Sequence, residues 1–437
     1  MDFFTHIKSI LNEYYDNYYQ SLNDEPYSGI YFNDRKYQHF TNKNIFNNLT
    51  KHPIIDSNYI FKKSEHPLGK NVLFDLGLYY IQEPSAMLVS YLLDINENDK
   101  VIDLCAAPGG KSCFALNKAK FLLANDYSSS RSNVLSENIE RMGFKNVLVT
   151  NNEVSFLKDH YYGQFDKVIL DAPCSGEGMF RKNNDVFKDW SLEKVESLVK
   201  IQKQLIIDAY QLLKKDGIMV YSTCTYELKE NEEIINYLLS NTNASLITIK
   251  EINGSIRGFN QKEAIRLIPP YFKGEGHFIA LIKCNDEHQP IKNSFNLTHP
   301  NKQQLKLYKD FEKKYLVNAF NEKNIIINNN HLHLIDDNFV FCKGLKIKRS
   351  GLHLGEIKKD RFIPSFALSR YLNKEDFKEV IELDEEQVSS YLKGNTLNIK
   401  TADGYKLLTY QNIPVSFAKA SNNILKNHYP KGLRKNQ

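Results

Sequence analysis

The stretch DLCAAPGGKS (103–112) decides the fold of this chain, because it ends an apolar strand in an acidic residue and continues into a glycine-rich turn. The strand reads KVIDLC (100–105), and the helix predicted after the turn reads CFALNKAKF (113–121). Glycine lets a backbone approach a ligand closely, and a helix start offers free N–H groups to a carboxylate. Neither G-x-G-x-x-G nor a Walker A motif is present. An ordinary turn needs only the two glycines, so the whole string predicts a ligand site.

Short apolar runs alternate with helical patterns on both sides of this turn. Strands are predicted at 100–105, 121–125, 146–150, 166–171, 217–223 and 277–283, and helices at 133–142 and near 191–214. This alternation predicts a parallel α/β sheet over residues 71–285. In such sheets, ligand sites collect in the loops beyond the carboxyl ends of the strands. The sequence therefore places its polar motifs at one edge of the sheet.

The two flanking regions have other patterns. Residues 1–70 open with FFTHIKSILNEYYDNYYQSL (3–22), whose apolar side chains at helical spacing predict a packed amphipathic helix rather than an RNA-stacking surface. These side chains are Phe4, Ile7, Ile10, Leu11, Tyr14, Tyr15, Tyr18 and Tyr19. Residues 286–437 predict one or two small α+β modules. Their strand-like run is 339–347, their helix 365–372 and their β-rich end 396–410.

Composition excludes several classes of protein. The 437 residues are 42% hydrophobic and 25% charged, which is typical of a folded globular chain and excludes disorder over most of it. No run approaches the roughly 18 apolar residues of a membrane span, and the first residues do not resemble a signal peptide. The six cysteines form no C-x-x-C pair. We therefore expect a cytoplasmic protein with reduced thiols, no membrane association and no metal site, with His331 and His333 at the surface.

Candidate site residues follow several of the predicted strands. Asp126 follows the second strand, where it fits either a ribose ligand or a helix N-cap, and Glu153 follows the third as a weaker candidate. The fourth strand ends in DAPCSGEGMFRK (171–182), and the fifth in YSTCTY (221–226). Cys174 and Cys224 would then face one site. Local N–H groups and cations could stabilise a thiolate there.

These strings resemble the RNA cytosine-5 methyltransferases of the Nop2/Sun/RsmB type, which use S-adenosyl-L-methionine. GLYYIQEPSAM (77–87) and RLIPPYFKGEGHFIALIK (266–283) are similar to further motifs of that family, with mild departures at Pro270 and at His277-Phe278. GLHLGEIKKDRFIPSFAL (351–368) and IPVSFAKASNNILKNHYPKGLR (413–434) resemble the C-terminal region of its RsmF branch, which methylates small-subunit (16S) rRNA. The resemblance implies a class I Rossmann-like methyltransferase domain with a small N-terminal α+β domain and a C-terminal PUA-like RNA-binding region. It divides the chain at 1–70, 71–285 and 286–437.

The resemblance also implies a role for each candidate residue. Cytosine C5 becomes reactive after a thiolate adds to C6, and the matching nucleophile is Cys224. Asp171 would stabilise or protonate the ring at N3, and Cys174 would serve the later release step, as a base or by positioning one. Lys111 would orient the reacting centre. The residues that match the cofactor site are Cys105, Ala106, Ala107, Pro108, Gly109, Gly110, Lys111, Asp126, Glu153 and Asp171.

An RNA partner is supported by two basic segments. Residues 343–361 carry seven basic and two acidic side chains, and residues 418–437 carry five basic side chains and no acid. The branch resemblance favours small-subunit rRNA or its assembly intermediate. The same chemistry on tRNA stays open as an alternative, as does a non-catalytic rRNA-binding assembly factor. DNA methylation does not fit, because DNA cytosine-5 enzymes use the cysteine of the P-C motif as nucleophile.

Overall fold

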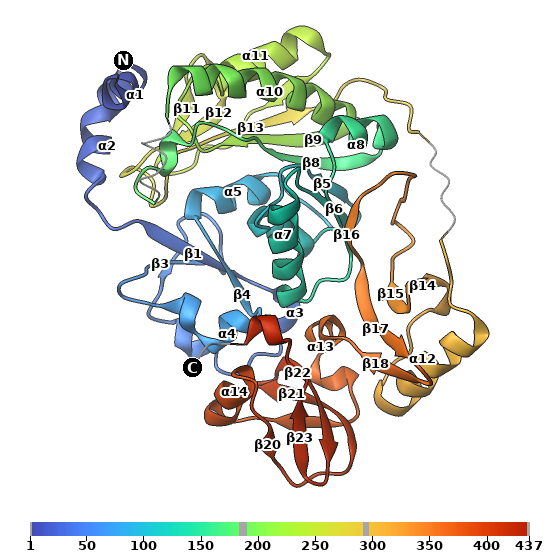
Figure 1. The fold of residues 1–437 in the computed structure, drawn as a ribbon. Helices are drawn as coiled ribbons and strands as arrows, with labels where there is room; N and C mark the ends of the chain where they lie inside the picture. The colour runs from blue at the N-terminus through green and yellow to red at the C-terminus, as the bar shows by residue number, and fades with distance from the viewer. Residues whose placement is uncertain (1, 183–189, 292–296, 435–437) are drawn as a thin grey trace.

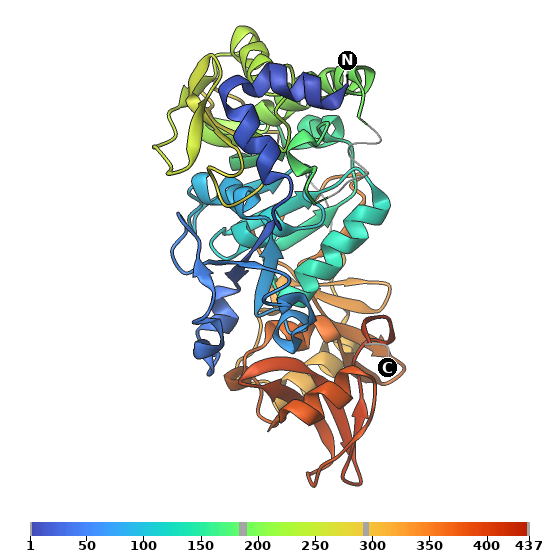
Figure 2. The ribbon, with the colours of Figure 1, turned by 90° about the vertical axis from the view of Figure 1, so that its left-hand side faces the viewer.

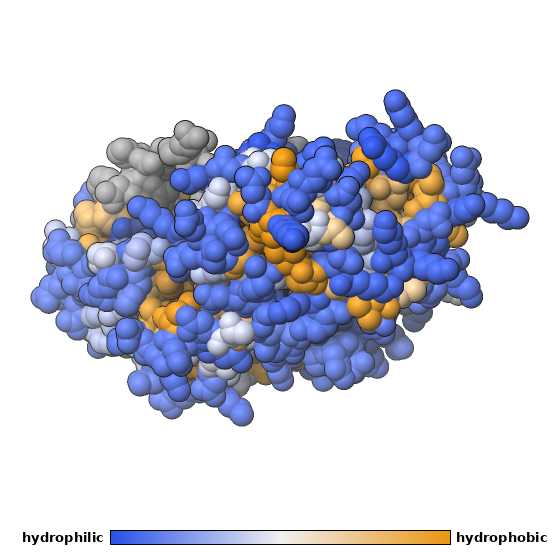
Figure 3. All heavy atoms as spheres, turned by 90° about the horizontal axis from the view of Figure 1, so that it is seen from below, coloured by the Kyte–Doolittle hydropathy of each residue, from blue (hydrophilic) through white to orange (hydrophobic). Residues whose placement is uncertain are grey.

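The computed structural model describes residues 2–182, 190–291 and 297–434 (Figure 1). Its strands form four sheets. In a view turned by 90°, the C-terminal modules lie at the end opposite the N-terminal helices (Figure 2). From below, the surface is mostly hydrophilic, with smaller hydrophobic patches between the polar side chains (Figure 3).

The middle of the chain forms a ten-stranded sheet in the order β11-β12-β13-β9-β8-β5-β6-β7-β16, with β10 paired to β13. In chain order, its elements up to β13 are α5 (Pro84–Leu92), β5 (Lys100–Asp103), α6 (Gly110–Leu116), β6 (Phe121–Asn125), α7 (Ser129–Met142), β7 (Val147–Thr150), α8 (Val154–Tyr161), β8 (Phe165–Asp171), η4 (Glu177–Met179), α10 (Leu192–Gln211), β9 (Leu213–Thr223), α11 (Glu232–Asn241), β10 (Ser245–Ile247), β11 (Ser255–Gly258), β12 (Gln261–Leu267) and β13 (His277–Lys283). The five strands β9, β8, β5, β6 and β7 are parallel, as the alternation predicts.

Apolar side chains alternate between the two faces of this sheet. Val101 and Leu122 pack with α5, α6 and α7, whereas their neighbours Ile102 and Leu123 pack with α8, α10 and α11. Both faces are therefore covered by helices, which explains why these strands read as continuous apolar runs.

The predicted helix at 113–121 is wrong in its bounds. It begins at Gly110 and ends at Leu116, because Phe121 already belongs to β6.

The N-terminal region has two separate parts. The predicted amphipathic helix is confirmed but interrupted, since α1 (Phe3–Leu11), η1 (Asn12–Tyr14) and α2 (Tyr15–Ser21) follow one another and Asn12 has a φ of 45°. The remaining elements are β1 (Tyr27–Phe32), α3 (Asp34–Tyr37), η2 (Lys43–Phe46), β2 (Thr50–Lys51), β3 (Tyr59–Lys62), η3 (Leu68–Lys70), α4 (Val72–Asp75) and β4 (Tyr79–Gln82). Their strands form an antiparallel sheet in the order β2-β3-β1-β4.

The C-terminal region forms two modules. Their elements are α12 (Lys302–Tyr315), η5 (Glu322–Asn324), β14 (Ile325–Asn328), β15 (His331–Leu334), β16 (Ile347–Ser350), β17 (Leu352–Lys358), β18 (Arg361–Pro364), α13 (Phe366–Tyr371), η6 (Lys374–Asp376), β19 (Val380–Glu382), α14 (Glu385–Leu392), β20 (Leu397–Asn398), β21 (Gly404–Tyr410), β22 (Ile413–Ser421), β23 (Ile424–Asn427) and η7 (Lys431–Leu433). The two sheets have the orders β14-β15-β17-β18 and β19-β21-β22-β23-β20. One strand of this region, β16, pairs with β7 and extends the central sheet.

The predicted strand at 339–347 is wrong, because the chain forms loops and a turn until β16 begins. Phe339 and Phe341 are nevertheless buried with the central sheet, and the ring of Phe339 lies 4.8 Å from that of Phe121. The apolar pattern therefore reflects burial rather than strand pairing.

His331 is exposed as expected, whereas His333 is half-buried beside His353. Within the described ranges, no helix is long and apolar enough to cross a bilayer.

Candidate active site

Acidic side chains lie at the carboxyl ends of three neighbouring strands. Asp103 is the last residue of β5, Asp171 is the last residue of β8, and Asp126 directly follows β6. The order β8-β5-β6 puts these three strand ends next to one another, as the sequence predicts for a parallel sheet. Asp103 and Asp126 are buried. Burial raises the pKa of Asp103 to about 7. This edge of the sheet therefore gathers three carboxyl groups, an arrangement that suits a cationic ligand.

The glycine-rich turn after β5 holds its backbone close to other groups. Gly109 has a φ of 111°, a conformation that side chains other than glycine rarely adopt. A Cβ atom on Gly110 would lie 2.9 Å from the Gln82 side chain. The hydroxyl of Tyr31 donates to the Gly110 carbonyl at 2.6 Å, so the N-terminal sheet supports the turn. The shape of this turn thus depends on glycine at both positions, for conformation at Gly109 and for space at Gly110.

Lys111 and Asp171 form an ion pair across the edge of the sheet. The Lys111 Nζ donates to Asp171 Oδ2 at 2.7 Å, and the Ser222 hydroxyl donates to Asp171 Oδ1 at 2.7 Å. Burial raises the pKa of Asp171, but the charge of Lys111, the charge of His277 and two side-chain hydrogen bonds together outweigh burial and hold that pKa below its ordinary value. Burial lowers the pKa of Lys111, and Asp171 in turn raises it above its ordinary value. Both groups are therefore charged at neutral pH.

Asp126 ties the glycine-rich turn to the end of β6. Its Oδ2 accepts the Ala107 N–H at 3.2 Å, and its Oδ1 accepts the Ser128 N–H at 3.0 Å. Arg131 lies 3.4 Å away as an ion-pair partner. The alternative interpretation of Asp126 as the N-cap is wrong, because Ser128 caps α7 with its side chain. The carboxylate is thus fixed beside the turn.

The other residues of the expected cofactor loop form the wall beside Asp126. The Ala106 N–H donates to the Asn125 carbonyl at 2.8 Å, and Asn138 donates to the Pro108 carbonyl at 2.9 Å. Burial raises the pKa of Cys105 above its ordinary value. Glu153 lies at the start of α8 and is exposed. It shares the sheet edge with the acids, but its side chain caps no helix.

Cys174 and Cys224 are brought together at the ends of β8 and β9. Their sulfur atoms lie 3.3 Å apart, and the Cys224 N–H donates to Cys174 Sγ at 3.3 Å. Both side chains are half-buried. The hydrogen bond with Cys224, reinforced by burial, raises the pKa of Cys174 well above its ordinary value. The raised pKa favours the protonated thiol at Cys174, so the stabilised thiolate expected at this site stays a prediction.

Two glutamates that the sequence analysis missed join the cysteine loops. Glu177 accepts hydrogen bonds from the Thr225 hydroxyl at 2.8 Å and from the Tyr226 N–H at 3.1 Å. Glu230 accepts the Ser175 N–H at 3.0 Å, and burial raises the pKa of Glu230 to about 7. The loop after β8 contains Cys174 and Glu177, and the loop after β9 contains Cys224 and Glu230. Each glutamate thus accepts hydrogen bonds from the other loop. Glu177 and Glu230 follow the ends of β8 and β9 by six and seven residues, too far for the strand-end signal that indicated Asp126.

The basic side chains of residues 343–361 differ in whether they are exposed. Arg349 is buried and pairs with Glu140 at 2.7 Å, so it stabilises the fold. The other basic side chains of 343–361 are exposed, namely Lys343, Lys346, Lys348, Lys358, Lys359 and Arg361. Of these, Lys346 and Lys348 lie at β16, whose neighbour β7 ends near the acidic edge.

Models of four related domains match successive parts of this chain. Their descriptions are the N-terminal domain of 16S rRNA methyltransferase RsmF (1–84), 16S rRNA methyltransferase RsmB/F (90–283), the RsmF rRNA methyltransferase first C-terminal domain (310–372) and the methyltransferase RsmF PUA domain (378–435). These matches confirm the predicted fold class, a Rossmann-like methyltransferase domain with a PUA-like C-terminal region.

Relatives with the same description match most of the chain. The ribosomal RNA small subunit methyltransferase F of Shewanella oneidensis is 31% identical over 402 residues, which are 87% of this chain and 84% of the relative. That of Vibrio vulnificus strain YJ016 is 30% identical over 388 residues, with coverage of 85% and 82%. A methyltransferase homologue from Pyrococcus horikoshii has a similar fold, with a TM-score of 0.55 and 24% identity, and covers 63% of this chain and 92% of its own.

Proposed function

The chain belongs to the RsmF branch of the 16S rRNA methyltransferase RsmB/F family, and from that membership we propose that it methylates cytosine C5 in small-subunit rRNA. The observation that carries the proposal is the pair of cysteines with sulfurs 3.3 Å apart, on the segments that follow β8 and β9, with Asp171 as the last residue of β8. Methylation at a ring carbon needs covalent activation, and a nucleophilic thiol supplies it. Transfer to an amine or hydroxyl would need neither cysteine.

We propose S-adenosyl-L-methionine as the methyl donor, and the residues at the sheet edge fit its functional groups. The bound cofactor supplies a methyl group on a positively charged sulfur. Asp103 Oδ1 is buried without a hydrogen-bond partner among the described residues, so it can accept the ammonium group of the donor. Asp126 would accept the ribose hydroxyls, as the acid after the second strand does in other doubly wound sheets. Residues 105–111 would enclose the methionine part, and Glu153 would lie near the adenine.

In the proposed reaction, Cys224 gives up its thiol proton and its sulfur forms a covalent bond to C6, while N3 takes up one proton, so the adduct carries no net charge. Electron density moves to N3 and C5, and C5 then takes the methyl group. Asp171 lies on the neighbouring strand, where its carboxylate would stabilise the protonated N3. The ion pair with Lys111 keeps this carboxylate ionised, which favours the stabilising role over proton donation. Lys111 would hold Asp171 in place.

We propose that Cys174 serves the release step. After methyl transfer, the proton on C5 must leave before the bond between C6 and Cys224 can break. The sulfur of Cys174 lies beside that of Cys224, where it can take this proton or position a base that does. Its raised pKa means that it must first lose its own proton to act as the base itself. In both routes, the electron pair of the broken C5–H bond re-forms the C5–C6 double bond and Cys224 leaves C6 as a thiolate. The proton on N3 is then released and restores the Cys224 thiol.

The flanking domains would bind and present the RNA. We propose an RNA-recognition role for residues 1–70 and for the PUA-like region within 286–437, with catalysis in 71–285. The target cytosine must be unstacked before Cys224 can reach C6, and unpaired loops of RNA offer such bases at the lowest cost. The exposed lysines of 343–361 would neutralise phosphates near the site.

Bisulfite sequencing of small-subunit rRNA and tRNA, from cells with and without this protein, tests the proposal. We expect one or more 5-methylcytosines of the rRNA to disappear with the protein and return when it is restored. Loss of methylation from tRNA alone would leave the chemistry in place and overturn the substrate. Unchanged methylation in both RNAs would contradict the reaction and favour the assembly-factor alternative.

Replacement of Asp126 should weaken cofactor binding. An Asp126→Ala variant loses the charged acceptor proposed for the ribose, and a hydrogen bond to a charged group contributes about 1.5–3 kcal/mol. We therefore expect the Kd for S-adenosyl-L-methionine in isothermal titration calorimetry to rise about 10- to 100-fold. Asp56→Ala removes an exposed carboxylate and serves as the control. An unchanged Kd in Asp126→Ala would show that this acid does not bind the cofactor.

A further inference from the structure

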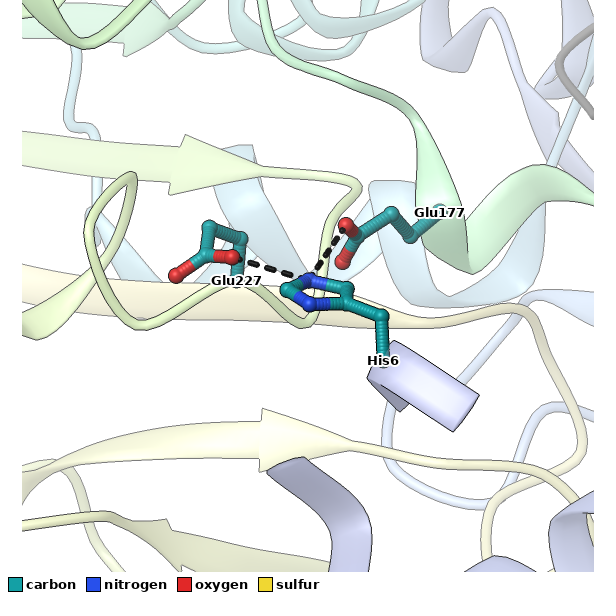
Figure 4. A group of neighbouring side chains, drawn as sticks. All are labelled: His6, Glu177 and Glu227. Carbon is teal, nitrogen blue, oxygen red and sulfur yellow. Dashed lines mark ion pairs between the residues drawn. The ribbon is translucent and has the colours of Figure 1, made fainter. Parts of the chain in front are cut away.

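His6 of α1 lies between two glutamates of the active-site loops (Figure 4). Its Nε2 is 2.9 Å from Glu227 Oε2 and 3.4 Å from Glu177 Oε1. All three side chains are buried, with relative exposures of 8%, 5% and 0% for His6, Glu227 and Glu177. A buried carboxylate is costly unless a positive charge or hydrogen bonds compensate it. The imidazole is therefore placed to compensate two of them.

The two glutamates occupy equivalent positions in the two cysteine loops. Glu177 comes three residues after Cys174, and Glu227 comes three residues after Cys224. Glu227 also accepts the Lys229 N–H at 2.9 Å, which fixes its own loop. A group that holds both glutamates therefore holds the two loops relative to each other. The loops in turn carry the two sulfur atoms.

The helix that carries His6 docks on these loops through aromatic rings. The ring of Phe3 lies 5.5 Å from Phe180 and 5.5 Å from Trp190, and the imidazole of His6 lies 4.9 Å from Trp190. The Trp190 Nε1 donates to Glu177 Oε1 at 2.9 Å. Helix α1 thus packs against side chains of the segment that follows β8, and His6 adds the contact with Glu227 after β9.

The charges around His6 favour its protonated form. Burial lowers the pKa of His6, but Glu177 and Glu227 outweigh burial and raise that pKa to about 9. Lys229 is the other cation near Glu227, and Glu230 adds negative charge on the side of Glu177. Without the imidazolium, two buried carboxylates would repel each other. Repulsion at this point would separate the two cysteine loops.

We propose that His6 is a positioning residue, an imidazolium from the N-terminal helix that clamps the Cys174 loop to the Cys224 loop. The proposal rests on the proposed function only for the roles of the two cysteines. It predicts that docking of α1 sets the geometry of the reaction although His6 touches no substrate. The N-terminal segment is thereby part of the catalytic machinery in addition to any RNA contact.

A divalent cation is the competing occupant of this cluster, since one nitrogen and two carboxylate oxygens lie within 4.8 Å of one another. A divalent cation would need further ligands, and no other His, Cys, Asp or Glu side chain of the described residues joins these three. An imidazolium needs no further ligand there. We therefore prefer the proton to the metal, and the first experiment separates them.

Trp190 is the only tryptophan of the chain, so its fluorescence reports on this cluster directly. An imidazolium quenches a neighbouring indole more strongly than a neutral imidazole does. As the pH rises, the Trp190 emission of the full-length protein should therefore increase in one step with a midpoint near pH 9. The His6→Gln variant should lack this step. Lys8→Ala, which removes an exposed cation of the same helix, should keep it. A step that persists in His6→Gln, or emission that changes with added Zn²⁺ at pH 7.5, would overturn the proposal.

Loop geometry is measured by kinetics and by thiol alkylation. At pH 7.5, His6→Gln should lower kcat about 10- to 100-fold, with KM values for RNA and cofactor within about twofold of wild type. Iodoacetamide should label Cys174 and Cys224 at least about threefold faster, because the loops open more often. The alkylation needs no methylation activity, so it tests the clamp even if the proposed reaction is wrong. Lys8→Ala should match wild type in both measurements.

A double variant distinguishes loss of the clamp from simple misfolding. In His6→Gln/Glu227→Gln, the repulsion between the carboxylates is gone, so kcat should recover at least about fivefold over His6→Gln. A purely structural loss would make the double variant as poor as the single one or worse. Equal alkylation rates in wild type and His6→Gln, or a KM effect without a kcat effect, would also overturn the clamp.

Discussion

A Cys224→Ala variant should retain its fold and bind S-adenosyl-L-methionine with an affinity close to that of the wild type, while methylation of rRNA falls at least about a thousandfold. The sulfur lies at the end of β9, outside the glycine-rich turn and the acids proposed to bind the cofactor. Its removal takes away the nucleophile that makes C5 reactive, and no second route activates a ring carbon. Single-turnover transfer of a radiolabelled methyl group measures the loss.

The matched control for this variant is Cys342→Ala. Cys342 is a buried thiol of the C-terminal region beneath the central sheet, so its replacement reports on a general effect of losing a cysteine. This control should keep most of the methylation rate. Turnover retained by Cys224→Ala would remove Cys224 from the mechanism. A large loss of cofactor affinity would instead assign the sulfur to the cofactor site.

The sequence could predict those parts of the site that lie within a few residues of a strand end. Asp103, Asp171 and Cys224 each end or follow a strand whose apolar run is visible in the sequence. A parallel sheet aligns its carboxyl ends, so local patterns alone bring these residues to one edge. The central strands and the helix at 366–371 were predictable for the same reason. The fold class followed from their order.

The parts that could not be predicted depend on contacts between distant segments. His6 belongs to an apolar helical pattern that explains its burial without indicating its partners, which follow it by 171 and 221 residues in the sequence. Strand β16 joins β7 from almost 200 residues away, whereas its own sequence suggested a strand beginning at 339. In both cases local propensity was compatible with several structures. Tertiary packing selected one.

A Cys174→Ala variant should accumulate a covalent protein–RNA adduct. Addition of Cys224 and methyl transfer do not need Cys174, whereas removal of the C5 proton does in the proposed mechanism. The bond between Cys224 and C6 would then persist after transfer. Denaturing gel electrophoresis with a radiolabelled target RNA should show a slower band in Cys174→Ala that is absent from the wild type.

The double variant Cys174→Ala/Cys224→Ala identifies the bond in that band. It should form no adduct, because the sulfur that attaches the RNA is gone, and nuclease digestion of the single variant should leave a modified nucleotide on the peptide that contains Cys224. Adduct formation should also require S-adenosyl-L-methionine if release is the blocked step. If Cys174→Ala turns over normally without a slower band, Cys174 has no part in release. If it forms no adduct and no product, the hydrogen bond from the Cys224 N–H to Cys174 Sγ serves to place the nucleophile, and the proton on C5 leaves by another route.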